Sequence, residues 1–367
     1  MRLRLVSVAA LLSIATLVLA GVVAPRPAEA FEAGFDAAWI GQGYGHDFTT
    51  SWDPAAVDLV FARAARAGGS VVRLWLFEGA PKQGVVFDPS GTRATGLVPG
   101  FLDHIEAVCR AARRAGVRVY WTGHDGNWFS PLHTRFADIH YNILEDKYGE
   151  GVAFRERALG PVLDVIARYP DTVFAYDVMN EVEGSVAKWF WTDGWTGARR
   201  WIHDEVAFVH ARAPGIAATA SAGWESAVPD LLAGRFSGLG LDFYDLHLYN
   251  DDGTIPQAFE LRLLGWRTAT PFVLGEFGQK SQRLDDALQR KVTAGFLAAA
   301  RAQGFLAALG WRLDDERPST PSFSPVLSYY RNGQERPAAG DVRAFVAAHP
   351  CGRTSAWAYL RALGLRP

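Results

Sequence analysis

Eight short apolar runs alternate with helical stretches along the chain, and this alternation constrains the fold more than any other feature of the sequence. The runs span residues 34–43, 70–79, 117–126, 172–181, 216–224, 242–251, 270–279 and 304–313. In the first gap, Asp53 can cap a helix, Pro54 suits its first turn and Gly68-Gly69 end it. Strands that alternate with helices run parallel in one sheet, and eight of them fit a closed (β/α)₈ barrel, or TIM barrel, of the α/β class.

An open, doubly wound parallel sheet is the alternative arrangement for such a pattern. That fold normally has a G-x-G-x-x-G turn directly after its first strand. Residues 41–48, GQGYGHDF, contain glycines without that spacing and are typical of a simple turn. We therefore expect one catalytic barrel over residues 31–350. The amphipathic pattern of residues 351–367 predicts an extra C-terminal helix docked on it.

The first thirty residues have the pattern of an export signal. Arg2 and Arg4 form a basic start, residues 5–24 are apolar, and Ala28-Glu29-Ala30 has the small-x-small pattern of a cleavage site. An uncleaved membrane anchor is the alternative, because about 20 apolar residues can just span a bilayer. We expect residues 1–30 to be a cleaved signal peptide and the mature protein to be secreted or extracytoplasmic.

Charge and cysteine content exclude several classes of function. The net charge is −2, and removal of residues 1–30 takes away three positive charges and one negative charge, which leaves −4. A chain so nearly balanced offers no electrostatic case for binding nucleic acid. Cys109 fits a buried thiol on an apolar helical face, and a disulfide to Cys351 is the alternative in an exported chain. Neither cysteine lies near a candidate base, so thiol catalysis is not expected. We expect a monomer with no membrane partner after signal cleavage.

Ionisable and amide groups gather at the carboxyl-terminal ends of the predicted strands. His124 comes at the end of the third run, Asn180 and Glu181 end the fourth, and His247 and Tyr249 come late in the sixth. In a barrel of parallel strands all of these ends lie on one face, where the active sites of such barrels are built. One pocket is therefore expected to collect residues from distant parts of the chain.

Glu181 and Glu276 form the most informative pair. Glu276 comes late in the seventh run, which lies roughly opposite the fourth in a ring of eight strands, so the two carboxylates can face each other across the mouth. Two facing carboxylates suit glycoside hydrolysis: one group donates a proton to the leaving oxygen, and the other attacks the anomeric carbon or activates a water. A glutamate at a strand tip can also be a solvated end residue, and Glu183 is an alternative acid.

With these residues in place, the chain resembles the clan A retaining glycoside hydrolases, and most closely glycoside hydrolase family 5, the cellulases and mannanases, over about residues 35–315. Asn180-Glu181 is similar to the clan's Asn-Glu pair, whose glutamate is the acid/base, and Glu276 in VLGEFG is similar to its nucleophile. The other matches are Arg73 in VVRLW, His124, the pair His247 and Tyr249 in HLY, and Trp311. Two departures leave the subfamily and the substrate open: Val182 stands where family 5 usually has proline, and the TGHDGNW context of the third run matches only approximately.

The resemblance implies a retaining β-glycoside hydrolase that cleaves O-glycosidic bonds of β-linked mannan- or glucan-type polysaccharides or oligosaccharides, with carbohydrate as its partner and no cofactor or metal. Glu276 would form a covalent glycosyl-enzyme, and Glu181 would protonate the leaving oxygen and then deprotonate water. Tyr249 would orient Glu276, and Arg73 would favour its ionised form. The residues expected to bind substrate are Arg73, His124, Asn180, His247, Tyr249 and Trp311.

The chain holds 13 tryptophans, an unusual load that needs an explanation. Sugar rings present flat C–H faces that stack on aromatic side chains, and Trp311 would form the floor of such a site. Tryptophans that follow other strands are further candidates on the same face, although such residues can also simply pack down a loop. They are Trp128, Trp189, Trp191, Trp195 and Trp224.

Two other classes of function fit parts of the pattern. A metal-dependent barrel hydrolase could use His124, Asp125, His247 and Asp251 as ligands, but the first run lacks the His-x-His pair that such sites commonly use. Zinc analysis of purified protein would distinguish it. A non-catalytic carbohydrate-binding barrel is the second class. The presence of both glutamates argues against it, and activity on a chromogenic glycoside would decide the question.

Overall fold

The computed structural model describes residues 31–40, 48–77, 84–91, 93–129, 149–187, 194–314 and 326–350. The expected signal peptide at 1–30 and the expected C-terminal helix at 351–367, which includes Cys351, lie outside these ranges. Trp189, Trp191 and the side chain of Trp128 also lie outside the described residues. Within the described ranges, no helix combines the length and the apolar character needed to cross a membrane.

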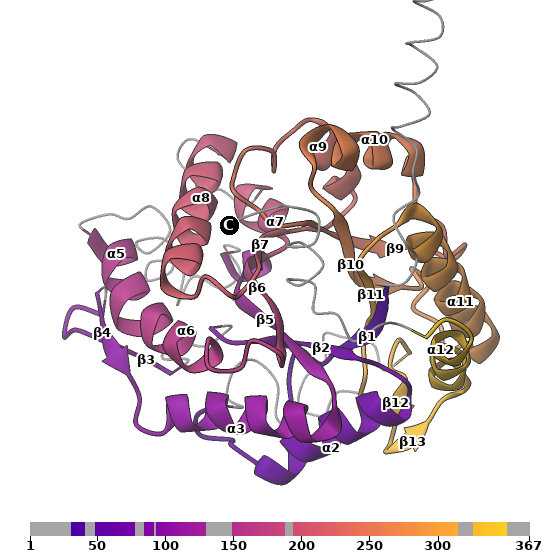
Figure 1. The fold of residues 1–367 in the computed structure, drawn as a ribbon, viewed down its shortest axis with the longest axis horizontal. Helices are drawn as coiled ribbons and strands as arrows, with labels where there is room; N and C mark the ends of the chain where they lie inside the picture. Colours follow the sequence, from indigo (N-terminus) through magenta and orange to yellow (C-terminus); the bar gives the residue numbers. More distant parts are fainter. Residues whose placement is uncertain are drawn as a thin grey trace, which may run out of the picture.

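A parallel sheet occupies the centre of the molecule, and helices surround it (Figure 1). Its strands are β1 (Glu32–Asp36), β2 (Val71–Trp75), β5 (Arg118–Asp125), β6 (Val173–Asn180), β7 (Ala218–Thr219), β8 (Ser221–Ala222), β9 (Tyr244–Tyr249), β10 (Phe272–Gly278) and β11 (Ala307–Gly310). They lie in the order β7-β6-β5-β2-β1-β11-β10-β9-β8, and every pairing between them is parallel. Each of the eight runs predicted from the sequence overlaps a strand, and β7 and β8 both fall in the fifth run.

The fifth run closes the barrel by changing its partner in the middle. β7 pairs with β6, β8 pairs with β9, and Ala220 alone separates the two short strands. The two edge strands of the nine-stranded sheet, β7 and β8, therefore belong to one continuous stretch of chain. Counted as one strand, they close the sheet into an eight-stranded barrel. The prediction of a (β/α)₈ barrel over an open doubly wound sheet is confirmed.

Helices follow most of the strands, and most of them form the outer layer (Figure 1). They are α2 (Pro54–Arg66), α3 (Phe101–Ala115), α5 (Glu150–Phe154), α6 (Gly160–Ile166), α7 (Val182–Ala187), α8 (Trp195–Arg212), α9 (Ala227–Leu232), α10 (Ala258–Thr268), α11 (Asp286–Gln303) and α12 (Pro337–Ala348). Two antiparallel hairpins lie outside the barrel, β3 (Val85–Phe87) with β4 (Ala94–Leu97) and β12 (Tyr330–Arg331) with β13 (Gln334–Glu335).

Local sequence signals explain where these helices begin and which face they bury. Asp53 caps α2 as predicted, since its carboxylate accepts hydrogen bonds from the backbone N–H groups of Ala55 at 2.9 Å and Ala56 at 3.2 Å. In α3 the predicted apolar face is buried, and it includes Cys109. Cys109 is a free, buried thiol, and burial raises its pKa to about 12, which makes it an unreactive core residue.

Inside the barrel, a layer of apolar side chains is followed further along the strands by a charged layer. Tyr120, Phe174 and Phe243 pack against one another at ring-centroid distances of 5.5 to 6.1 Å in the apolar layer. In the next layer, Arg73 and Asp177 are both fully buried. Burial of a charge costs several kcal/mol unless the charge is paired, so each charged group in this layer needs a partner of opposite charge inside the barrel. It forms the base of the site described below.

Candidate active site

The fourth and seventh strands of the barrel bring Glu181 and Glu276 together. β6 ends at Asn180, and Glu181 then takes a left-handed backbone conformation with φ of 47°, which is uncommon for a residue with a side chain. Glu276 lies inside β10 at a point where the pairing register shifts. One carboxylate oxygen of each glutamate and one ring nitrogen of His247 all lie within 4.8 Å of one another.

Arg73 is the fully buried cation beneath this pair. Its Nη1 donates to Glu276 Oε1 at 2.8 Å and lies 3.4 Å from Asp36 Oδ1. Its Nη2 donates to Asp177 Oδ2 at 2.6 Å and to Asn180 Oδ1 at 2.9 Å. A planar guanidinium that is always charged can serve several oxygen acceptors at once. Arg73 therefore ties Glu276 to groups on β1 and β6.

His247 and Tyr249 come from β9 and lie on the same side of it, because they are two residues apart. His247 Nδ1 lies 3.1 Å from Glu181 Oε1 and 3.6 Å from Glu276 Oε1. Tyr249 Oη donates to Glu276 Oε2 at 2.7 Å. Both oxygens of Glu276 are therefore held, one by Arg73 and one by Tyr249. Glu181 is the more accessible carboxyl group, with a side chain that is 14% exposed against 5% for Glu276.

Burial and mutual contacts set the protonation of these three groups. Burial alone would lower the pKa of His247, but the charge of Glu276 and the hydrogen bond to Glu181 raise it to about 9. Burial alone would raise the pKa of Glu181, but hydrogen bonds from His247 and Asn127 hold that pKa below its usual value. Burial raises the pKa of Glu276 above its usual value, against the opposing charges of His247 and Arg73. At neutral pH the free protein therefore has a proton on His247, between the two carboxyl groups.

Asn127 is a site residue that the sequence analysis missed. Its Nδ2 donates to Glu181 Oε2 at 2.7 Å and to Asp125 Oδ1 at 3.1 Å, and its Oδ1 accepts from Trp224 Nε1 at 2.8 Å. Asp125 Oδ1 also accepts from Asn180 Nδ2 at 2.9 Å, and burial raises the pKa of Asp125 to about 7. The Asp-x-Asn spacing of Asp125 and Asn127 in the sequence could have indicated this residue. An aspartate at a strand end commonly accepts the backbone N–H two residues on, and Asp125 does so at 3.0 Å.

A glycine at position 223 lets the fifth strand approach Glu181 closely. A Cβ atom on Gly223 would lie 2.3 Å from Glu181 Cγ and 2.4 Å from its Cδ. Ser221 Oγ accepts from the backbone N–H of Glu181 at 3.0 Å, and Gly223 N–H donates to Glu183 Oε2 at 2.8 Å. Glu183 is buried in α7, and burial raises its pKa to about 8. These contacts make Glu183 a support for the backbone beside Glu181 rather than the alternative acid.

Three buried aspartates near Arg73 were also not singled out from the sequence: Asp36, Asp177 and Asp245. Burial, reinforced by the charge of Glu276, raises the pKa of Asp36 well above its usual value. Burial also raises the pKa of Asp177. Each aspartate lies within a strand among apolar residues, where a carboxyl group needs a partner, and that position was the signal that could have found them.

His124 lies outside this cluster, which corrects its predicted placement in the cleft. It sits opposite Met179 in the pairing of β5 with β6. Its ring packs against the rings of Phe77, Phe154 and Trp201, at centroid distances of 6.0, 4.9 and 5.6 Å. Because Phe154 and Trp201 belong to helices, His124 faces the outer layer and is part of the packing between helices and sheet.

The structure does not bring together the four metal ligands that the sequence suggested. His124 packs among aromatic rings, and Asp251 instead accepts backbone N–H groups from the loop after β10. The group of described residues that could hold a cation is Glu181, His247 and Glu276. Imidazole and carboxylate suit several divalent metals. Such a cation would compete with the proton that His247 holds.

Trp311 lies in an aromatic group just beyond the end of β11, against which Tyr249 packs. Its ring meets those of Trp39 and Trp75 nearly edge-on, at centroid distances of 6.1 and 5.9 Å. Tyr249 packs against the same group and donates to Glu276, so the aromatic group adjoins the carboxyl cluster. The expected position of Trp311 near the site therefore agrees with its surroundings.

Trp195 and Trp224 differ in what they offer a ligand. Trp195 packs edge-on against Phe236 at a centroid distance of 5.5 Å, so it holds down its own segment of chain. Trp224 follows β8 with φ of 62°, and it is 41% exposed. An exposed indole beside a buried polar cluster is a surface on which a sugar ring can stack.

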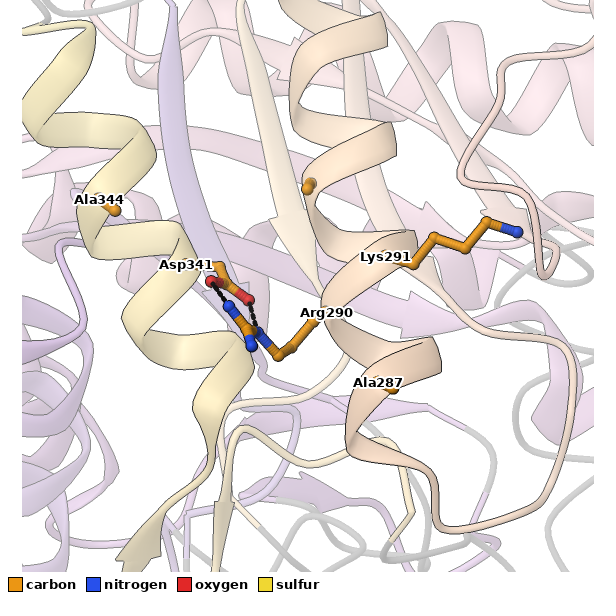
Figure 2. A pocket seen from close by; sticks show the side chains of 6 residues that line it. Ala287, Arg290, Lys291, Asp341 and Ala344 are labelled. Carbon is orange, nitrogen blue, oxygen red and sulfur yellow. Dashed lines mark hydrogen bonds and ion pairs between the residues drawn. The ribbon is translucent and has the colours of Figure 1, made fainter.

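A separate surface pocket lies between α11 and α12 in the outer helical layer (Figure 2). Arg290 pairs there with both oxygens of Asp341, at 2.7 and 3.0 Å, and Lys291 points away from that pair. The Arg290–Asp341 pair is partly exposed and already satisfied. We assign no ligand to this pocket.

No protein-family model and no curated protein sequence matches the chain. Solved structures do match. The β-mannanase from the blue mussel Mytilus edulis is 18% identical with a TM-score of 0.60, over 85% of this chain and 92% of that one. The endo-1,4-β-mannanase from Eisenia fetida is 18% identical with a TM-score of 0.63, over 86% and 91%. The GH5_18 protein from Streptomyces cattleya, in complex with Manβ1-4GlcNAc, is 17% identical with a TM-score of 0.64, over 92% of each chain.

The fold and the cluster together define a class: (β/α)₈ barrels with two glutamates at the ends of the fourth and seventh strands. The structural neighbours show that the chain is similar in fold to glycoside hydrolases of family 5. The resemblance that the sequence motifs indicated is confirmed at the level of the fold.

Proposed function

We propose that the protein is a secreted, retaining β-glycoside hydrolase that cleaves β-linked polysaccharides or oligosaccharides of the mannan or glucan type. The observation that carries the proposal is the approach of a carboxylate oxygen of Glu181 to within 4.8 Å of one of Glu276. Retaining enzymes hold their two carboxyl groups about 5–5.5 Å apart, whereas inverting enzymes need about 6.5–9.5 Å to admit a water.

Glu276 suits the role of nucleophile because both of its oxygens are held. Arg73 donates to one oxygen and Tyr249 to the other, which fixes the orientation of the carboxylate and opposes the effect of burial on its pKa. In the first step Glu276 attacks the anomeric carbon as the bond to the leaving oxygen breaks. The product of that step is a covalent glycosyl-enzyme.

Glu181 needs a proton at the start of this reaction, yet in the free protein that proton lies on His247. The hydrogen bond of 3.1 Å from His247 Nδ1 to Glu181 Oε1 provides the route for its transfer. A sugar ring in the cleft would exclude water from Glu181, and loss of water favours the neutral acid. Transfer leaves neutral His247 and a protonated Glu181 that donates to the leaving oxygen. In the second step the Glu181 carboxylate takes a proton from the attacking water.

The known structural neighbours support the choice of substrate class. Two of them are β-mannanases, and the third binds a disaccharide with a Manβ1-4 linkage. Trp224, which is 41% exposed and is linked to Glu181 through Asn127, offers an aromatic side chain on which a sugar could stack. The pattern of residues 1–30 supports export, where polysaccharide substrates are met.

Hydrolysis of aryl β-mannosides and β-glucosides, followed by a panel of mannans and glucans, tests the activity. Glu276→Ala should abolish turnover, and azide or formate should partly restore it with inverted product, because a small anion can enter the vacated space. Glu181→Ala should spare the first step for substrates with an activated phenolate but slow the second. Glu260→Ala removes an exposed glutamate on α10 and is the matched control, which should keep wild-type rates.

Two results would contradict the proposal. If NMR of the wild-type reaction shows inversion at the anomeric carbon in the first-formed product, Glu276 is a general base and not a nucleophile. If purified protein holds a stoichiometric metal that activity requires, then Glu181, His247 and Glu276 form a metal centre instead.

A further inference from the structure

Trp224, which is 41% exposed, is linked to Glu181 through the side chain of Asn127. The indole N–H donates to Asn127 Oδ1 at 2.8 Å, and Asn127 Nδ2 donates to Glu181 Oε2 at 2.7 Å. His247 Nδ1 contacts the other carboxylate oxygen of Glu181, Oε1, at 3.1 Å. The two oxygens of Glu181 therefore have separate partners, and Trp224 acts on only one of them.

The indole N–H determines which way the Asn127 amide faces. Its Nδ2 has two hydrogens, and these meet Glu181 Oε2 and Asp125 Oδ1. A flipped amide would turn Oδ1 toward two carboxyl groups and its own hydrogens toward the indole N–H, so every contact would become repulsive. The donor on Trp224 therefore selects the orientation in which Asn127 supports Glu181.

The backbone around Trp224 is shaped to hold this contact. Trp224 takes a left-handed conformation with φ of 62°, which costs free energy for a residue with a side chain. Gly223, the preceding residue, lies so close to Glu181 that a Cβ atom would collide with it. The buried Glu183 accepts the Gly223 N–H at 2.8 Å. This segment therefore holds Trp224, a partly exposed residue, at the edge of the site in an unfavourable backbone conformation.

We infer that Trp224 is a positioning residue for Glu181, that it acts through Asn127, and that its indole meets the sugar on the leaving-group side of the bond, where Glu181 acts. The hydrogen-bonded chain stands without the proposed function, whereas the part played by the sugar rests on it. A ring packed on the indole would exclude water from the Trp224–Asn127 contact and strengthen it. Sugar binding at the surface would in this way fix the orientation of Glu181, and the strengthened hydrogen bond would oppose the rise in the pKa of Glu181 that loss of water causes.

The direction of the effect on Glu181 follows from the donor that Asn127 supplies. A hydrogen bond to a carboxylate favours its ionised form, and Asn127 is among the groups that lower the pKa of Glu181. Weakening this bond should raise that pKa. The charged and titratable groups that face Glu181 from other strands and from α7 are Arg73, Asp125, Glu183, His247, Tyr249 and Glu276. A variant that removes only the indole N–H leaves all of them in place.

The test is a titration of Glu181 in the free protein by ¹³C NMR with carboxyl-labelled glutamate, in which Glu181→Gln assigns the signal. Asn127→Ala should raise the pKa of Glu181 by about one unit, since it removes a hydrogen bond to a charged group. Trp224→Phe should raise it by at least about half a unit. Replacement of Trp224 by 3-benzothienylalanine keeps the ring and removes only the N–H, and it should give the same shift. Trp266→Phe alters an exposed tryptophan on α10 and should leave the pKa unchanged.

Activity measurements separate this inference from the proposed function. On an oligosaccharide, the benzothienyl variant should keep the wild-type KM but lower kcat several-fold and move the Glu181 limb of the pH profile upward. If wild-type protein hydrolyses no glycoside, the proposed function fails while the titration still tests the chain. If Asn127→Ala shifts the pKa of Glu181 and both Trp224 variants leave it within about 0.2 unit of wild type, the inference is overturned. An unshifted pKa in Asn127→Ala would overturn it as well.

Discussion

Replacement of Gly223 by alanine tests the assignment of Glu181 through its geometry, without any change to a charged group. The new Cβ atom would lie 2.3 Å from Glu181 Cγ, 2.4 Å from Cδ and 2.5 Å from Oε1. Ordinary van der Waals contact begins near 3.4 Å, so the Glu181 side chain must retreat by about 1 Å. The backbone of Gly223 cannot easily yield, because its N–H is bound to the buried Glu183.

A displacement of this size should weaken or break both hydrogen bonds of the Glu181 carboxyl group. Its hydrogen bonds of 2.7 Å from Asn127 and 3.1 Å from His247 would lengthen beyond useful range or lose their alignment. Misplacement of a reacting group by about 1 Å commonly lowers the rate by about 10²-fold, and we expect a loss of that order in kcat/KM. The overpacking should also destabilise the fold by about 1–3 kcal/mol.

The assay compares aryl glycosides with good and poor leaving groups, alongside a thermal melt. Gly223→Ala should slow a substrate with an alkyl leaving group far more than a dinitrophenyl glycoside, because only the first needs a proton from Glu181. Gly215→Ala is the matched control, since a Cβ atom there meets nothing within 4 Å, and it should retain wild-type activity. Equal losses on both substrates, or no loss on either, would refute the role of Glu181 as the acid.

Three further predictions concern stability, pH and processing. Arg73→Lys keeps the charge but cannot serve Glu276 and Asp177 with separate donors, so it should lower kcat/KM by at least about 10²-fold and destabilise the protein by about 3 kcal/mol in denaturant titrations; wild-type stability would contradict this. Glu183 has a folded-state pKa of about 8, raised from 4.5, so its contribution to stability is present at low pH and is lost as pH rises from about 4.5 through about 8. Glu183→Gln cannot ionise, and its melting temperature should fall less than that of wild type across this window; parallel curves would disprove the ionisation. N-terminal sequencing of the exported protein should find Phe31 first, whereas an intact N-terminus on a membrane-bound product would indicate an anchor.

The sequence predicted the barrel well because its signals are local and repeated. Each strand is a short apolar run, and most are separated by a helix with recognisable ends, as Asp53 and Pro54 illustrate for α2. The division of the fifth run into β7 and β8 was not predictable. Both halves consist of small residues, Ala218-Thr219 and Ser221-Ala222, and the change of partner at Ala220 depends on how the whole barrel closes.

Parts of the site followed from strand ends, and other parts did not. Glu181 and Glu276 could be paired because parallel strands bring their carboxyl ends to one face. The predicted position of His124 was wrong because the end of a strand fixes the height of a residue along the barrel axis. It does not fix whether the side chain faces the inside of the barrel or the outer helices. Asn127 was missed because it lies beyond the strand, in a turn whose direction is set by Asp125. Alternation within a strand says nothing about such turns.

The change of partner in the fifth run has a consequence for how the protein responds to heat. β7 and β8 each pair with their neighbour over only two register positions, so the free energy of local opening should be lower here than in the longer strands. The stretch formed by β7 and β8 lies between β6 and β9, the strands that position Glu181 and His247. Local opening here would separate Glu181, the proposed proton donor, from His247 while the rest of the barrel stays folded. Inactivation should therefore begin several degrees below the midpoint of global unfolding, and amide hydrogens at 218–222 should exchange first among the barrel strands.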